Sequence, residues 1–249
     1  MKEFLIRQLL GDSYTVEYYD ELPSTNDRAL ELARADAPHG TVVVAEYQSA
    51  GRGRRGTHWS APVGSSILAS LILRPEKHLS PHVLAIYSGA IVASALDILG
   101  ISAKVKWPND IMVNDLKVAG ILIETTGDAV VIGIGINHNV PDDAFPPDLH
   151  YPAGSLTQLG YPSPIELIFA KVIKELQQNL PLAYEERLLK LLLLWNKYNW
   201  LKRRKVRVCG HMGVMEGDGV FLSGNDMKFH VFRDGGVVPM PLTCKIEVI

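Results

Sequence analysis

The sequence has very little cysteine and no long apolar run. Only two of its 249 residues are cysteines, Cys209 and Cys244, which is too few for a disulfide framework. We expect both to be small core residues in a reducing compartment, the cytoplasm. Residues 1–10 mix charged and apolar side chains and lack the features of a signal peptide. No uninterrupted apolar run approaches the roughly 18 residues of a transmembrane helix, so we expect no membrane partner.

An excess of charge of one sign is also missing. The chain has 25 Lys and Arg against 27 Asp and Glu, a net charge of −2, which gives no general attraction to nucleic acid. The basic stretch at 202–205 is interpreted as a solvated link. His78 and His82 are four residues apart, but no carboxylate completes a metal set with them, and we expect them at the surface.

The order of apolar segments predicts an α+β fold with a mixed, mostly antiparallel sheet and flanking helices. A change to short β segments with glycine-rich turns after residue 205 predicts a small appended barrel. We therefore expect two domains, 1–200 and 201–249. Strands are expected at 14–19, 41–47, 65–73, 105–107, 111–113, 117–124 and 129–137. Helices are expected at 27–35, 81–99 and 163–197, the last with a break near Pro181, and a surface loop at 139–153.

A loop rich in glycine and arginine, Gly-Arg-Gly-Arg-Arg-Gly at 51–56, follows the expected strand at 41–47. Glycine lets the backbone approach a ligand closely, and arginine offers a planar fork of donors to carboxylate and phosphate oxygens. The segment after the loop does not open a helix, which argues against a dinucleotide-binding fingerprint. A mobile clamp for an anionic ligand is favoured over a solvated basic loop, and both remain open.

Two further stretches have residues suited to ligand binding. Asn109 and Asp110 follow Pro108 in a stiff turn and offer an amide and a carboxylate, although taken alone the motif favours an ordinary Asn-Asp turn. Lys117 begins a strand in which the small residue Gly120 leaves room for a ligand, the alternative being a solvated edge lysine. The glycines in the strand at 133–137 indicate close approach of another backbone or a ligand.

These elements, taken in order, resemble the biotin protein ligase family. The matching elements are Ser-Thr-Asn at 24–26, Glu-Tyr-Gln at 46–48 leading into the glycine loop and Trp59, and the stretches 106–110, 117–124 and 133–137. The resemblance runs from about residue 14 to 140, and the segment after 200 is similar to the SH3-like barrel of the family. It implies a class II synthetase-like ligase domain followed by that barrel.

The resemblance also implies an activity. Family members join biotin to ATP as biotinyl-5′-AMP, with Mg²⁺ as the expected metal. They then transfer biotin to a lysine of a biotin carboxyl carrier protein or domain, here of acetyl-CoA carboxylase or a related carboxylase. The resemblance leaves a homodimer open. The nearest alternatives are a lipoate or octanoate ligase of the same superfamily and a biotin-sensing regulator without catalysis.

Site residues follow from the matched positions. Lys117, Arg52 and Arg54 are expected to act in catalysis, and Asp110 is the candidate metal ligand. Biotin is expected at Ser24, Thr25, Asn26, Gln48, Gly51, Arg52, Gly53, Arg54, Trp59, Lys117 and Gly120. ATP is expected at Arg54, Arg55, Trp107, Asn109, Asp110, Lys117 and Asn137.

The chain departs from the family pattern in three ways. Thr57 stands where many members have a basic residue, which leaves phosphate contacts to Arg55 or His58. The aromatic residue that stacks on adenine has no clear match, and Tyr151 is the candidate. The sequence leaves no room for the N-terminal DNA-binding module of regulatory members, so we expect a ligase without repressor activity.

Overall fold

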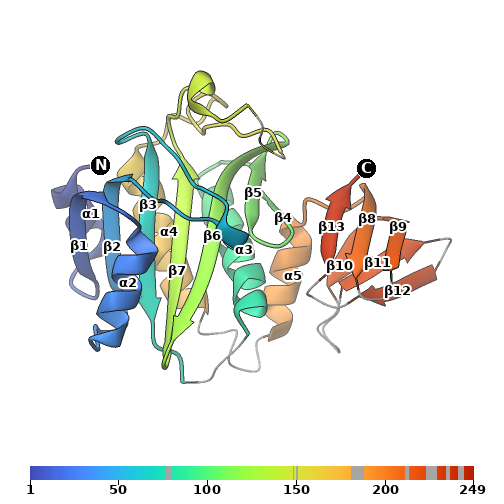
Figure 1. The fold of residues 1–249 in the computed structure, drawn as a ribbon, viewed down its shortest axis with the longest axis horizontal. Helices are drawn as coiled ribbons and strands as arrows, with labels where there is room; N and C mark the ends of the chain where they lie inside the picture. The colour runs from blue at the N-terminus through green and yellow to red at the C-terminus, as the bar shows by residue number, and fades with distance from the viewer. Residues whose placement is uncertain are drawn as a thin grey trace.

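A seven-stranded sheet forms the centre of the protein in this computed structural model (Figure 1). The strand order is β1 (Thr15–Leu22), β2 (Thr41–Gln48), β3 (Ser66–Leu73), β7 (Ala129–Asn137), β6 (Leu116–Thr126), β5 (Asp110–Val113) and β4 (Lys104–Lys106). Strands β1 and β2 pair in parallel and all other neighbours are antiparallel, which confirms the predicted mixed sheet. The structure describes residues 1–76, 80–147, 149, 151–180, 188–210, 213–222, 229–233, 236–240 and 244–249.

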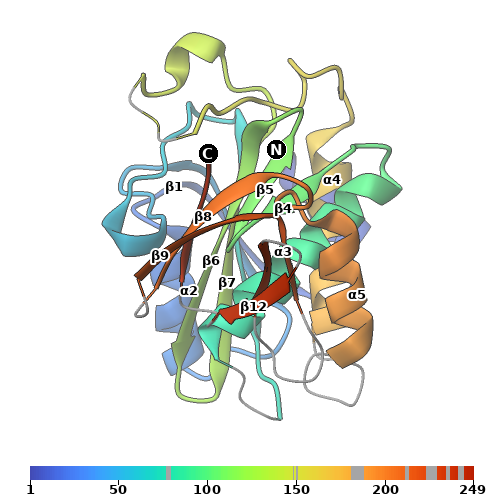
Figure 2. The ribbon, with the colours of Figure 1, turned by 90° about the vertical axis from the view of Figure 1, so that its right-hand side faces the viewer.

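Helices cover the two faces of the sheet unequally. One face packs against α1 (Glu3–Leu10), α3 (Pro81–Ile98), α4 (Ile165–Asn179) and α5 (Leu188–Tyr198), while α2 (Thr25–Arg34) lies on the other (Figure 2). Alternation along the strands feeds both cores, because successive side chains point to opposite faces. In β2, Val42 and Val44 join the larger core and Val43 packs with α2. The sequence analysis did not anticipate α1.

Helix α3 is apolar on nearly all sides because it lies between the sheet and the helices α4 and α5. By length and mean hydropathy it is the one described helix that meets the criteria for a membrane span, yet 67% of it is buried inside the protein. Residues 163–197 form two helices, as predicted, and the proposed break at Pro181 lies outside the described residues. His78 also lies outside them.

The C-terminal part forms two three-stranded antiparallel sheets rather than extending the large one. Their orders are β13 (Lys245–Val248), β8 (Lys205–Gly210), β9 (Gly213–Asp218) and β10 (Val220–Leu222), β11 (Phe229–Arg233), β12 (Gly236–Met240). Buried side chains such as Val206, Val231 and Ile246 belong to the same apolar cluster as the large sheet. The division at residue 200 remains a proposal.

Specific polar contacts attach these strands to the large sheet. The indole N–H of Trp107 donates to the carbonyl of Cys244 at 3.1 Å. The interpretation of 202–205 as a solvated link is wrong for Arg204: its guanidinium lies 3.9 Å above the Trp200 ring and pairs with Asp115. An arginine that stacks on an aromatic face and binds a carboxylate is an anchor, since both contacts fix its position.

Two adjacent leucines on α5 test this packing. Leu192 is 2% exposed and Leu193 is 63% exposed. We expect Leu192→Ala to lower the free energy of unfolding by about 2–4 kcal/mol, because truncation leaves a cavity. Leu193→Ala, the matched control, should change it by less than about 0.5 kcal/mol. Guanidinium unfolding followed by circular dichroism measures both, and equal losses would contradict the assignment of the buried face.

Candidate active site

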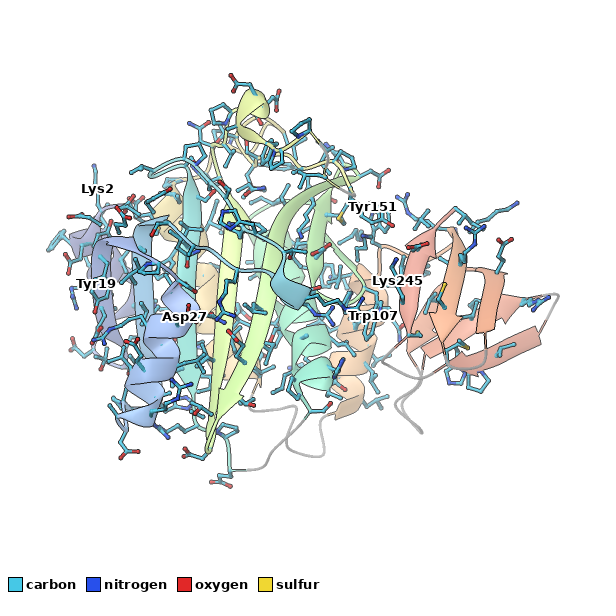
Figure 3. All side chains as sticks on the ribbon, viewed as in Figure 1. Lys2, Tyr19, Asp27, Trp107, Tyr151 and Lys245 are labelled. Atoms are coloured by element: carbon cyan, nitrogen blue, oxygen red, sulfur yellow. The ribbon has the colours of Figure 1, made fainter. Side chains whose placement is uncertain are left out.

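A cavity of about 460 Å³ lies beside α2 on the face of the sheet opposite α3, α4 and α5. Its walls come from the start of α2, the loop between β2 and β3, the strands β6 and β7, the segment near Tyr151, and β13. In Figure 3, Trp107, Tyr151 and Lys245 gather where the large sheet meets the C-terminal strands, while Asp27 lies on α2, away from them. The cavity therefore spans residues from nearly the whole length of the chain.

Uncharged polar side chains form the end of the cavity near α2. Ser24 caps the helix by accepting a hydrogen bond from the Asp27 N–H at 3.4 Å, which satisfies one of the free N–H groups of the first turn. The side-chain oxygen of Gln48 accepts from the Thr25 N–H at 2.6 Å. Ser24 and Thr25 are both buried, and with Gln48 they line the cavity as the resemblance implies.

Asn26 lies in the same wall, but its side chain is engaged by the protein. Its amide oxygen accepts from the Ser70 hydroxyl at 2.6 Å, and its NH₂ donates to Glu124 at 2.8 Å. A Cβ added at Gly133 would lie 2.2 Å from that amide oxygen, so the glycine makes room for Asn26. Through these contacts Asn26 links α2 to β3 and β6 of the sheet.

The Trp59 ring lies against two glycines that are cross-strand partners, Gly120 on β6 and Gly135 on β7. A Cβ would come within 3.1 Å of the ring at Gly120 and 2.5 Å at Gly135. The space above these two glycines was expected to hold a ligand or a second backbone. In the structure an aromatic side chain from the glycine loop occupies it, and this side chain forms a wall of the cavity.

The glycine loop is folded on itself. Gly53 N–H donates to the Thr57 carbonyl at 2.7 Å, and Trp59 N–H donates to the Gly51 carbonyl at 2.9 Å. The Thr57 hydroxyl donates to the Arg54 carbonyl at 2.9 Å, so the residue that departs from the family pattern tightens the turn. Gly51 is the one predicted site residue outside the cavity wall: a Cβ there would lie 2.4 Å from the Trp59 carbonyl oxygen.

The two arginines expected to bind anions differ in their surroundings. Arg54 is directed at the cavity, where it donates to the amide oxygen of Asn109 at 3.4 Å. Burial, and next the neighbouring Arg55, lower the pKa of the Arg54 guanidinium, which stays charged near neutral pH. Arg52 instead pairs with two carboxylates, Asp27 and Glu124. The expected role of Arg52 in catalysis stays a prediction, and in the structure its guanidinium is already paired.

Two lysines in the cavity wall share one carboxylate. Lys117 Nζ lies 2.8 Å from one oxygen of Asp110, and Lys106 Nζ lies 3.9 Å from the other. Lys106 is 5% exposed and its ammonium lies 3.0 Å from the centroid of the Tyr151 ring. Burial holds the pKa of Lys106 at about 8, below its ordinary 10.5. Lys106 was not among the predicted site residues, because nothing in the short strand Lys-Val-Lys distinguishes it from the neighbouring Lys104.

Asp110 is the predicted metal ligand of this cavity. Within the described ranges no group of three His, Cys, Asp or Glu residues gathers. The Asp110 carboxylate contacts the ammonium groups of Lys117 and Lys106, and its assignment to a metal stays a prediction. The same carboxylate fixes the position of the Lys117 ammonium.

The remaining predicted nucleotide contacts also meet at the cavity. Asn109 donates to the Ile121 carbonyl at 2.7 Å, and Asn137 donates to the Gly154 carbonyl at 3.2 Å. Both amides and the Trp107 ring line the wall. The wall also includes Lys245, Ile246 and Glu247 of β13, which no sequence motif indicated, because they lie more than 100 residues beyond the last predicted site residue, Asn137.

The sequence and the fold both match known proteins. Residues 18–137, from β1 to β7, match the model of the biotin/lipoate A/B protein ligase family. Over 148 residues the chain is 43% identical to the bifunctional ligase/repressor BirA of Bacillus subtilis, a match of 57% of this chain and 46% of that protein. It is 35% identical over 214 residues to the protein of that name from Escherichia coli, across 81% of this chain and 65% of the relative.

The chain belongs to the biotin/lipoate A/B protein ligase family. Its matches span less than two thirds of the length of these curated relatives. The structure of the biotin protein ligase from Aquifex aeolicus in complex with biotin and ATP superimposes with a TM-score of 0.82 at 25% identity, and the match covers 94% of this chain and 99% of that one. This likeness confirms the predicted fold class. Unlike the family match, which ends at residue 137, the structural match covers most of the chain.

Lys106 gives this family member a testable pH dependence of stability. Its folded pKa lies below the ordinary value, so keeping it charged costs stability in full below pH 8, and the cost disappears as pH rises toward 10.5. We expect Lys106→Met to raise the free energy of unfolding at pH 7 by roughly 2 kcal/mol. The gain should shrink above pH 8. Urea unfolding of both proteins from pH 6 to 10 checks this, and a gain that does not change with pH would contradict it.

Proposed function

We propose that the chain is a biotin protein ligase. It joins biotin to ATP as biotinyl-5′-AMP, releases pyrophosphate, and transfers biotin to a lysine of a biotin carboxyl carrier protein or domain. One observation carries the proposal: a single cavity has buried neutral polar groups at one end and clustered cations at the other. The A. aeolicus relative, whose structure contains biotin and ATP, supports it.

The neutral end suits the bicyclic ring of biotin. That ring has a ureido group with N–H donors and a carbonyl acceptor, and it carries no charge. Ser24, Thr25 and Gln48 offer hydroxyl and amide partners to it, while the Trp59 ring forms an apolar side. A site built to hydrogen-bond such a group rejects analogues that lack it, because its own buried polar atoms would be left unpaired.

The cationic end suits the first step of the reaction. A biotin carboxylate oxygen attacks the α-phosphorus of ATP, the bond to the β-phosphate oxygen breaks, and pyrophosphate leaves. Negative charge accumulates at this junction, and fixed positive charges stabilise it without reorganisation. Lys117 pairs with Asp110 and lies 5.6 Å from the centroid of the Trp59 ring, and Arg54 and Lys106 line the same cavity, which supports a role for these cations at the junction.

The second step needs no nucleophile from this chain. The lysine amine of the carrier attacks the acyl carbon of the mixed anhydride, and AMP leaves with the bonding electron pair. Until then the anhydride must be kept from water. The glycine loop and Trp59 would exclude water by closing over the anhydride. We further propose that the protein works in the cytoplasm, where carrier and ATP are available, and we leave a homodimer open.

A lipoate or octanoate ligase is the main alternative, because the family description includes lipoate. The discriminating assay is exchange of labelled pyrophosphate into ATP with biotin, lipoate or octanoate offered separately. We expect exchange with biotin alone, and exchange with lipoate but not biotin would overturn the assignment. Operator binding by the purified chain without any exchange would favour a biotin-sensing regulator.

Lys117→Ala tests the first step. Loss of a positioned cation should lower pyrophosphate exchange by about 100-fold or more, a typical effect for one stabilising group. The melting temperature should change by only a few degrees, since Lys117 is partly exposed. Lys202→Ala, at an exposed site outside the cavity wall, is the control. Exchange at the wild-type rate would rule out the assigned role.

Arg54→Gly tests retention of the intermediate. Arg54 lies on a loop with no core role, so the fold should survive its loss. Removing one charge-assisted contact should speed release of biotinyl-AMP roughly tenfold or more. Release is measured by trapping free adenylate during single-turnover synthesis, with Arg7→Ala on α1 as the control. Unchanged leakage would contradict the prediction.

A further inference from the structure

Arg52 is held by carboxylates from two separate elements. Its guanidinium pairs with Asp27 in the first turn of α2 and lies 3.1 Å from Glu124 on β6. One positive and two negative charges leave this cluster with a net charge of −1. A phosphate approaching Arg52 would therefore meet net repulsion, unlike one approaching Arg54, which is directed at the cavity.

The cluster is fastened to the rigid wall of the sheet. Glu124 accepts from the Asn26 NH₂ at 2.8 Å, and the Asn26 oxygen accepts from the Ser70 hydroxyl at 2.6 Å. Ser70 lies on β3 and is fully buried. Arg52 is thus the one loop residue joined by a continuous chain of contacts to the neutral polar end of the cavity.

Arg52 also lies next to the contact that places Trp59. Gly51 accepts from the Trp59 N–H at 2.9 Å, and Arg52 forms a β-bridge with His58. Because of this pairing, a shift of the backbone at Arg52 would also shift the paired backbone at His58. The Trp59 ring, which lies against Gly120 and Gly135, would lose its fixed position over the cavity.

We propose that Arg52 is a positioning residue: its pairing with Asp27 and Glu124 is a latch that holds the loop and Trp59 closed over the ring of the ligand. Phosphate binding is left to Arg54 and the two lysines. The inference rests on the proposed function for the identity of the ligand. The latch itself rests on the geometry of Arg52, Asp27, Glu124 and Asn26.

The test compares Arg52→Gln, Glu124→Gln and the double variant. Glu124→Gln keeps an oxygen for Asn26 while removing the charge that holds Arg52. Each single variant should speed biotin dissociation roughly three- to tenfold, the range expected for a partly exposed ion pair that is also hydrogen-bonded. The double variant should be no faster than Arg52→Gln alone, because that substitution already removes the contact with Glu124. The KM for ATP in pyrophosphate exchange should stay within twofold.

The opposite results would overturn the latch. If Arg52 bound phosphate, Arg52→Gln would raise the KM for ATP, and Glu124→Gln would lower it by freeing the guanidinium. Additive effects on biotin dissociation would also sink the proposal. Glu31→Gln, another exposed carboxylate on α2, is the matched control and should leave dissociation unchanged.

A second readout keeps the latch separate from the proposed function. The loop has three arginines, so trypsin cuts it when it opens. In the ligand-free protein, Glu124→Gln and Asp27→Asn should be cleaved at Arg54 and Arg55 several times faster than the wild type and Glu31→Gln. Equal cleavage rates contradict the latch whatever the ligand is. A wild-type protein without biotin-dependent exchange would contradict the proposed function and leave the cleavage test valid.

Discussion

The contact between the Trp59 ring and the paired glycines of β6 and β7 is the constraint on which the cavity depends. Among the helices that the structure describes, four cover one face of the sheet and α2 alone covers the other. The uncovered strands have no side chain at Gly120 and Gly135, so the loop that carries Trp59 can lie directly on the backbone. A side chain at either position would lift the ring, and the loop would no longer form a wall of the cavity.

The positive charges in the cavity are not all paired with carboxylates, unlike the ion pairs that stabilise a fold. Asp110 is the single carboxylate between Lys106 and Lys117, and the arginines 54 and 55 add to the same field. Burial lowers the pKa of Lys106, and the nearby Lys117 lowers it further, so keeping Lys106 charged in the free protein is costly. An anionic ligand would relieve that cost, which is why a site for phosphate can be unfavourable in the free protein.

Local patterns in the sequence predicted much of this arrangement. The strands, the cap at Ser24 and the glycine loop follow from short-range chemistry, and they lie close to where alternation and turn signals placed them. The partners of Arg52 were not predictable in this way. Glu124 is 72 residues away in the chain, and no period or motif connects the two. The burial of Lys106 beneath Tyr151 and the approach of β13 are likewise products of tertiary packing.

The position of β13 links ligand binding to the whole chain. Ser24 near the beginning and Lys245 near residue 249 line the same cavity, with the sheet and the C-terminal strands between them. A molecule that fills it touches segments separated by more than 200 residues and binds only when all of them are folded. Occupancy therefore holds the C-terminal strands and the large sheet in one cooperative unit, with a stabilisation that grows as the logarithm of ligand concentration.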